Sequence, residues 1–171
     1  MAITVAILTV SDRCARGETQ DTSGPALAEL VQQLFCARVV AMACVPDEVG
    51  QIRGRLRAWS AQAVPPDLVL TTGGTGLAPR DVTPEATAGI LDRRHPGLLE
   101  LARLRCYPTT PRAFLSRGEA GVVDRSLVIN LPGSRRAATE YLQALADVLP
   151  HAIATLRGEA PDHGRADSGE V

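Results

Sequence analysis

A glycine-rich segment with hydroxyl side chains is the part of the sequence best suited to hold a phosphate. Residues 72–76 read Thr-Gly-Gly-Thr-Gly and come at the end of a short apolar run. A tight glycine turn between a strand and a helix can present several backbone N–H groups to an anion. One glycine usually suffices for a turn that needs positive φ, so three favour ligand binding over a purely structural turn. We therefore expect Thr72, Gly73, Gly74, Thr75 and Gly76 to bind phosphate.

Two acidic residues could place a metal ion beside such a phosphate. Asp81 lies just beyond the glycine segment, and Asp47 follows Val45-Pro46. A carboxylate next to a phosphate repels it unless Mg²⁺ lies between them. Each residue could instead cap the helix that follows it. Spacing alone leaves both interpretations equally open for Asp81 and favours capping for Asp47.

Two further turns are candidates for the same site. Ser11 and Asp12 end the first apolar run, and Pro132, Gly133 and Ser134 follow the last one. Ligands of open α/β sheets bind beyond the carboxyl ends of the strands, so these turns would share one rim with the glycine segment. Taken singly, each could be an ordinary turn.

The elements that would position these residues can be recognised from apolar patterning. Four apolar runs predict strands, and because they do not alternate with polar residues we expect both faces of each strand to be covered: Ile3–Val10, Val39–Val45, Leu68–Thr72 and Leu127–Leu131. Apolar residues at helical spacing separate the runs. The pattern predicts an α/β fold, a three-layer sandwich with a mostly parallel central sheet and helices on both faces.

Three local expectations concern the second half of the chain. Thr83, followed by Pro84, is expected to cap a helix. Residues 107–124 are rich in Pro, Thr, Gly and Arg, and we expect a loop there with some helix around Phe114. Pro150 is expected to kink or divide the last helix.

Composition bounds the function. With 171 residues, 45% of them hydrophobic, we expect one domain at 1–157 followed by a flexible tail at 158–171. A net charge of −1 offers no field that would attract nucleic acid or an anionic membrane, and no apolar segment is long enough to span a bilayer. Every basic residue is Arg, which excludes a lysine nucleophile, a Schiff base and a Walker A lysine. Four cysteines without a CxxC pair favour a reduced, cytoplasmic protein.

Taken together and in order, the motifs resemble the molybdopterin adenylyltransferase family, which includes the MogA-like proteins, MoaB and the N-terminal domain of gephyrin with its plant counterparts. The resemblance covers about residues 4–157. It is carried by Val5–Asp12, Asp21–Pro25, Val45–Glu48, Thr72–Gly76, Pro79–Thr87, Leu115–Arg117 and Asn130–Gly133.

This resemblance implies a mixed-sheet α/β fold, a homotrimer, and adjoining pockets for ATP and molybdopterin. It places the catalytic and Mg²⁺-binding roles on Asp47 and Asp81, and phosphate contacts on Gly73, Gly74, Thr75 and Gly76. It associates Ser116 with the pterin product, and gives pocket-lining roles to Ser11, Asp12, Pro132, Gly133 and Ser134. A contact with the enzyme that inserts molybdenum is also implied.

The alternatives come from other functional classes. The segment Asp21–Gly24 and the serine at 134 also resemble the MoaB branch, which would make this a pterin-binding protein without catalysis; Asp47, Asp81 and Ser116 favour the active branch. Competence-damage-like proteins carry a second domain, for which 171 residues leave no room. A dinucleotide-dependent oxidoreductase lacks its GxGxxG fingerprint here.

Overall fold

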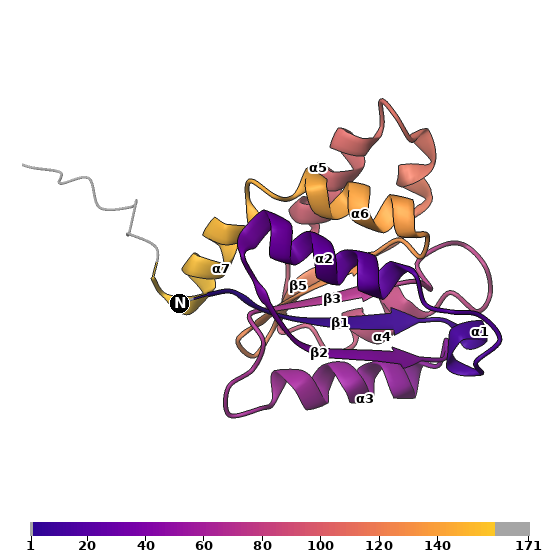
Figure 1. Ribbon diagram of the computed structural model, residues 1–171, viewed down its shortest axis with the longest axis horizontal. Coiled ribbons are helices and arrows are strands. Elements are labelled where there is room, and N and C mark those ends of the chain that lie inside the picture. The colour runs from indigo at the N-terminus through magenta and orange to yellow at the C-terminus, as the bar shows by residue number, and fades with distance from the viewer. Residues whose placement is uncertain (1, 160–171) are drawn as a thin grey trace, which may run out of the picture.

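Six strands form one mixed sheet in the order β2-β1-β3-β6-β5-β4 (Figure 1). The computed structural model describes residues 2–159. The strands are β1 (Thr4–Val10), β2 (Arg38–Val45), β3 (Leu68–Thr72), β4 (Arg93–Arg94), β5 (Ala120–Val123) and β6 (Ser126–Leu131). β2, β1, β3 and β6 are parallel, whereas β5 runs antiparallel to β6 and β4 antiparallel to β5.

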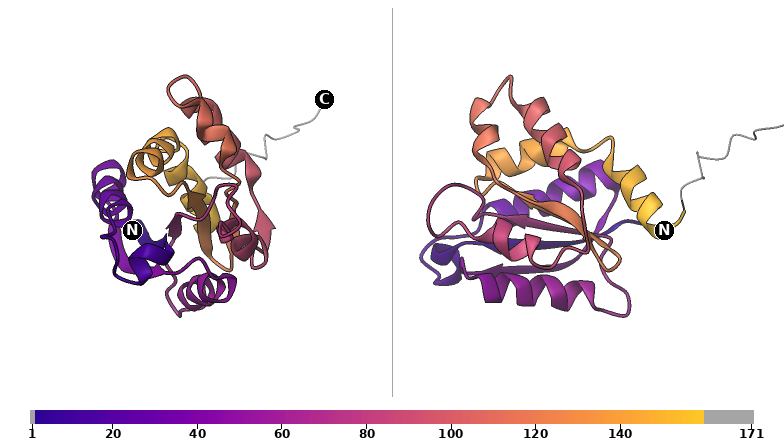
Figure 2. Two further views of the ribbon diagram at one scale, coloured as in Figure 1. Left: turned by 90° about the vertical axis from the view of Figure 1, so that its right-hand side faces the viewer. Right: turned by 180° about the vertical axis from the view of Figure 1, so that it is seen from behind.

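Helices cover both faces of the sheet, as the predicted sandwich requires (Figure 2). One face carries α2 (Ser23–Phe35), α5 (Pro96–Cys106), α6 (Arg135–Ala144) and α7 (Leu149–Arg157), and the other carries α3 (Val49–Ser60) and α4 (Thr83–Ala88). The short helix α1 (Asp12–Ala15) follows β1, and a 3₁₀ helix, η1 (Pro111–Leu115), follows α5. The last helical region is divided at residues 145–148, and Pro150 lies in the first turn of its second part, α7, so the expected division is confirmed.

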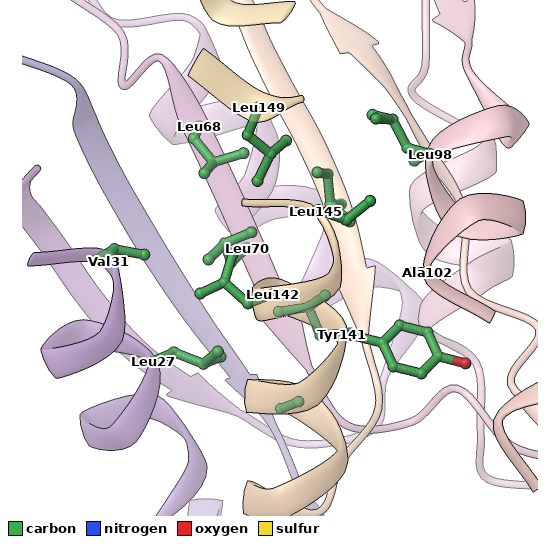
Figure 3. Packing of buried hydrophobic residues seen from close by; sticks show 14 of the residues in the cluster. Leu27, Val31, Leu68, Leu70, Leu98, Ala102, Tyr141, Leu142, Leu145 and Leu149 are labelled. Atoms are coloured by element: carbon green, nitrogen blue, oxygen red, sulfur yellow. The ribbon is translucent and has the colours of Figure 1, made fainter. Parts of the chain in front are cut away.

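The central strands are apolar on both faces because each face packs against a different helical layer. In β1, Val5 and Ile7 belong to one core cluster, whereas Ala6 and Leu8 belong to the other. The larger cluster joins the strands to α2, α5, α6 and α7, and Figure 3 shows part of it, with Leu27, Leu70 and Leu142 among the labelled residues. Burial on both sides explains the continuous apolar runs in β1, β3 and β6.

The expectation of full coverage is wrong for β2. This strand lies at one edge of the sheet, and its residues alternate between exposed and partly buried until Val45. Val40 and Met42 are 44% and 46% exposed. A run of apolar residues on an edge strand cannot be distinguished from a buried strand by periodicity alone.

The expected loop at 107–124 is corrected in part. The 3₁₀ helix confirms helical structure around Phe114, but Ala120–Val123 form β5, which pairs with β6 through the turn at 124–125. Four residues containing a glycine are too short to show a period. The pairing depends on a partner strand that only the tertiary fold supplies.

The last helix ends close to the C-terminal limit of the described residues. α7 ends at Arg157, and Gly158 adopts a left-handed conformation with φ 74°. The tail predicted at 158–171 lies, from residue 160 onward, outside the described residues. Between residues 2 and 159, no helix is long and apolar enough to cross a membrane.

Candidate functional site

The glycine loop, residues 73–81, follows β3, and its first two positions require glycine. Gly73 and Gly74 have φ values of 106° and 61°, which L side chains rarely adopt. A Cβ on Gly73 would collide with the backbone oxygen of Val10, and one on Gly74 would lie 2.7 Å from Oδ1 of Asp47 and closer still to the hydroxyl of Thr83. The loop is therefore pressed against the end of β1 on one side and against two oxygen-bearing side chains on the other.

This conformation leaves a row of backbone donors without partners. Within residues 2–159, the N–H groups of Gly74, Thr75 and Gly76 have no hydrogen-bond acceptor. Thr75 is only 4% exposed, so its N–H is costly to leave unpaired. Successive unpaired N–H groups can form a concavity that binds an anion, so this geometry offers the donors that the predicted phosphate site needs.

Arg117 holds the far half of the loop in place. Its Nε donates to the carbonyl of Gly76 and its Nη2 to the carbonyl of Asp81, both over 2.7 Å, and its Nη1 pairs with Glu85. Its backbone N–H donates to the carbonyl of Thr75. One guanidinium thus joins both ends of the loop to the segment before β5.

Two adjoining cavities open around this loop. The larger, of about 660 Å³, lies over α6 and η1, and the smaller, of about 330 Å³, lies over the ends of β1, β2 and β3. Gly74, Asp81 and Gly133 line both. The larger cavity also contains Thr75, Gly76, Ser116, Pro132 and Ser134, and the smaller contains Ser11, Asp47, Thr72 and Gly73. Of the predicted site residues, only Asp12 lines neither cavity.

Asp47 does not cap the helix that follows it. α3 has Glu48 at its N-cap without a side-chain bond, and Asp47 points instead to the turn after β1, where its Oδ2 accepts the N–H of Asp12 over 2.9 Å. In return the N–H of Asp47 donates to Oδ1 of Asp12 over 3.1 Å. Oδ1 of Asp47 accepts no hydrogen bond from the described residues.

The charge of Asp47 is poorly compensated. Burial raises the pKa of its carboxyl, and the neighbouring carboxylates of Asp12 and Asp81 raise it further. The bidentate ion pair with Arg80 lowers the pKa of Asp12. A cation bound next to Asp47 would therefore stabilise a negative charge that burial and the neighbouring carboxylates disfavour.

Asp81 does not cap a helix either. Its Oδ2 accepts the N–H of Ala78 over 2.9 Å and closes a turn inside the loop, and a Cβ on Gly76 would lie 2.8 Å from the same oxygen. α4 starts at Thr83 with Val82 as its N-cap, so the expectation that Thr83 caps this helix is wrong. The hydroxyl of Thr83 is fully buried and has no hydrogen-bond partner among the described residues.

The remaining predicted residues have clear structural contacts. The hydroxyls of Ser11 and Ser134 cap α1 and α6, accepting from the N–H groups of Cys14 and Ala137. Thr72 donates through its hydroxyl to the carbonyl of Pro132 over 2.7 Å, which ties the loop to the turn after β6. Ser116 donates to the hydroxyl of Thr75 over 3.2 Å. The predicted turns therefore meet at the rim, as parallel strands require.

Several residues at the site were not predicted from the sequence. Asp21 lines the smaller cavity, accepts from Thr9, and binds the first N–H groups of α2. Arg112, Arg136 and Tyr141 line the larger cavity. A position on a helix face or in a loop does not by itself indicate a cavity. The Asp-Thr-Ser-Gly-Pro run at 21–25, a cap followed by a first-turn proline, was the one local signal that could have identified Asp21.

Comparison with known proteins matches most of the chain. The family described as "Probable molybdopterin binding domain" matches residues 6–151. The molybdenum cofactor synthesis protein cinnamon of Drosophila melanogaster is 43% identical over 89% of this chain and 25% of its own length. Molybdopterin adenylyltransferase of Helicobacter pylori J99 is 37% identical over 91% of this chain and 89% of its own. The crystal structure of the molybdopterin biosynthesis enzyme MoaB from Thermus thermophilus is 52% identical, with a TM-score of 0.85, over 91% of this chain and 97% of that one.

The coverage differs between relatives. This chain spans about a quarter to a half of the length of several curated relatives that it matches, and 89% of the Helicobacter protein. The MoaB crystal structure confirms the α/β fold with its mixed sheet.

Proposed function

This chain belongs to the family of molybdopterin-binding domains, and from that premise we propose that it transfers AMP from MgATP to the terminal phosphate of molybdopterin. The products are adenylyl-molybdopterin and pyrophosphate. Relatives named molybdopterin adenylyltransferase, of which this chain spans 89%, support the proposal.

One observation carries the proposal. Where the two cavities meet, Gly74, Thr75 and Gly76 have unpaired N–H groups, and the first and last of these residues lie against the carboxylates of Asp47 and Asp81, respectively. The N–H groups can bind phosphate oxygens, and the neighbouring carboxylate oxygens can bind a cation. This combination suits a polyphosphate that carries a metal ion and few other ligands. Two cavities that share this junction suit a reaction between two phosphates.

For this reaction the main task of the protein is to position the two substrates. A phosphate oxygen of molybdopterin forms a bond to the α-phosphorus of ATP, and the bond from that phosphorus to the bridging oxygen of pyrophosphate breaks. The nucleophile is already anionic, so no general base is needed. The loop N–H groups would hold phosphate oxygens in line and stabilise the charge that develops on them. Among the described residues, the lining of the two cavities includes no His and no Lys, and no step of this reaction uses Cys14, which lines the smaller cavity.

The residues fit Mg²⁺. Oδ1 of Asp47 and the hydroxyl of Thr83 both lie against Gly74, and neither has a hydrogen-bond partner in the described region. No group of three or more His, Cys, Asp and Glu side chains between residues 2 and 159 could hold a metal by itself. Mg²⁺ in nucleotide enzymes is held by one or two carboxylates together with substrate phosphates, so Asp47 and Asp81 suffice. Bound there, Mg²⁺ would neutralise phosphate charge.

The test is release of pyrophosphate by the purified protein. With MgATP and molybdopterin together we expect stoichiometric pyrophosphate and adenylyl-molybdopterin, and with either substrate alone we expect none. Release that does not depend on molybdopterin would contradict the proposal.

A second candidate is a pterin-binding protein without catalysis, of the MoaB type. The chain is 52% identical to the Thermus protein named MoaB, against 37% to the Helicobacter adenylyltransferase, which favours the MoaB branch; the Thermus protein is itself named an enzyme, so this likeness does not favour the loss of catalysis. Binding of molybdopterin without pyrophosphate release would establish the second candidate. The paired carboxylates at the loop favour the enzyme.

We further propose a cytoplasmic homotrimer that contacts the enzyme inserting molybdenum. Support comes from the family, and from the Drosophila protein, in which a stretch like this chain is part of a protein about four times as long. Light scattering of the purified chain tests the trimer: the expected mass is three times 18.1 kDa.

A further inference from the structure

Arg80 lies among the carboxylates next to the smaller cavity, and it joins two turns that are far apart in sequence. Its Nε donates to Oδ2 of Asp12 over 3.0 Å and its Nη2 to Oδ1 of Asp12 over 2.8 Å. The same Nη2 donates to Oε1 of Glu48 over 3.0 Å. The side chain is 56% exposed, yet three hydrogen bonds fix it.

The contacts of Arg80 determine what Asp12 can do. Both oxygens of Asp12 are engaged by the guanidinium, and Oδ1 also accepts the N–H of Asp47. Three hydrogen bonds therefore occupy most of the acceptor capacity of the Asp12 carboxylate, whose two oxygens have about four lone-pair sites. The carboxylate that Arg80 holds also accepts the backbone N–H of Asp47, and the backbone N–H of Asp12 in turn donates to Oδ2 of Asp47. The two turns are thereby joined with Oδ1 of Asp47 next to Gly74.

From these contacts we infer that Arg80 is a positioning residue for the cation site: it holds Asp12 as a support and leaves Asp47 and Asp81 as the ligands. The inference rests on the proposed Mg²⁺ site. Without the guanidinium, the carboxylate of Asp12 would be free to turn away from the backbone N–H of Asp47 or to compete with Asp47 for the cation. The turn that carries Asp47 would then lose one of the two hydrogen bonds that join it to the turn after β1. Partners that orient metal ligands typically contribute 10- to 100-fold to metal affinity.

The direction in which metal affinity changes when Arg80 is replaced distinguishes a positioning role from a purely electrostatic one. Removing a positive charge from a cluster of carboxylates should by itself strengthen binding of a cation. Removing a support for the ligand should weaken it. The two roles therefore predict opposite changes in the same measurement.

The experiment titrates the full-length protein with Mn²⁺ alone, which shares the oxygen-ligand preference of Mg²⁺, and follows free Mn²⁺ by electron paramagnetic resonance. For Arg80→Gln we expect affinity about tenfold or more below wild type. Arg80→Lys keeps the charge but lacks the planar fork, so we expect an intermediate loss. In an Asp12→Asn background, Arg80→Gln should have little further effect.

Arg16→Gln is the matched control. Arg16 is 58% exposed, acts on Asp12 through charge, and bonds to Glu18 instead of to Asp12. We expect its affinity for Mn²⁺ to equal or exceed that of wild type. Circular dichroism and Tm verify the fold of each variant, and Arg80→Lys carries the test if Arg80→Gln does not fold.

The outcomes are separable. If Arg80→Gln binds Mn²⁺ as well as wild type or better, while Asp47→Asn and Asp81→Asn bind it weakly, the positioning role is overturned and the metal site stands. If wild type does not bind Mn²⁺, or the two Asp variants bind it as wild type does, the proposed metal site fails and this inference fails with it. Neither result decides pyrophosphate release, which is measured separately.

Discussion

Asp12 and Asp47 are bound to each other by two reciprocal hydrogen bonds, each from the backbone N–H of one residue to the carboxylate of the other, over 2.9 and 3.1 Å. The residues are 35 positions apart and follow neighbouring parallel strands. This pairing withdraws Asp47 from helix capping and directs its second oxygen to the glycine loop.

Asp81→Asn should retain the fold and lose turnover. An asparagine oxygen can still accept the N–H of Ala78, so the turn inside the loop is preserved. The loss of a charged metal ligand removes several kcal/mol of transition-state stabilisation, or about 100-fold or more in kcat. Pyrophosphate release measures the loss, and circular dichroism checks the fold. Normal turnover by a folded variant would exclude the catalytic role.

Asp47→Asn should lose turnover to a similar degree and yet be at least as stable as wild type without ligand. Burial raises the pKa of Asp47, so the native state favours its protonated form. The sign follows from linkage: this contribution to stability is present below the ordinary pKa of Asp and is lost as pH rises through the raised value. The stability advantage of the variant should therefore grow with pH. Urea unfolding of both proteins at pH 4 and pH 8 measures it, and an advantage that shrinks with pH would contradict the assignment.

Gly74→Ala should impair the loop, whereas Gly54→Ala should not. Alanine at 74 must adopt φ near 61° at roughly 1–2 kcal/mol, and its Cβ collides with Asp47 and Thr83. We expect weaker nucleotide binding and a lower Tm. Gly54 lies in α3 with no atom within 4 Å of its ideal Cβ, so alanine there should stabilise the helix by about 0.5–1 kcal/mol. Equal effects of the two substitutions would show that the loop conformation is unimportant.

Arg117→Lys should loosen the loop although the charge is kept. A single ammonium group cannot reach the carbonyls of Gly76 and Asp81 and the carboxylate of Glu85 in the geometry of the guanidinium fork. We expect a loss of about 2 kcal/mol in unfolding free energy and faster hydrogen exchange in residues 75–81. Unchanged exchange there would mean that Arg117 does not hold the loop.

Asp67→Asn should reduce stability at neutral pH but not in acid. Asp67 accepts from Arg157 over 2.7 Å and from Thr4; burial raises its pKa, but these bonds outweigh burial and hold the pKa below the ordinary value. This contribution is present above the unfolded pKa of Asp and is lost as pH falls through the folded value. We expect a deficit of about 2 kcal/mol at pH 7 that narrows below pH ~4. Urea titrations at both pH values measure it, and a deficit that persists in acid would refute the charge-based explanation.

Short stretches of sequence were sufficient to predict the elements whose residue types follow directly from their surroundings. The apolar runs at β1, β3 and β6, the glycine loop and the divided last helix are all visible in short windows, because burial on two faces and positive φ select residue types directly. The rim could also be foreseen, since the carboxyl ends of parallel strands must lie at one edge.

Other features depend on contacts between distant parts of the chain. Four residues became β5 only because β6 offers a pairing edge, and β2 is half exposed only because no strand lies beyond it. Local sequence suggested that Asp47 caps a helix. In the structure its carboxylate instead accepts the backbone N–H of Asp12, in the turn after β1.

The sequence by itself determined the kinds of groups at the site: glycines, hydroxyls, carboxylates and arginines, with no lysine. Tertiary structure decided which of the carboxylates are free to bind a cation. Arg80 engages Asp12 across 68 residues, and Arg117 binds the glycine loop across 41, so the assignment depends on how the turns converge. Residue type sets what a group can do chemically, but whether its oxygens are available depends on partners that only the folded chain brings within hydrogen-bonding distance.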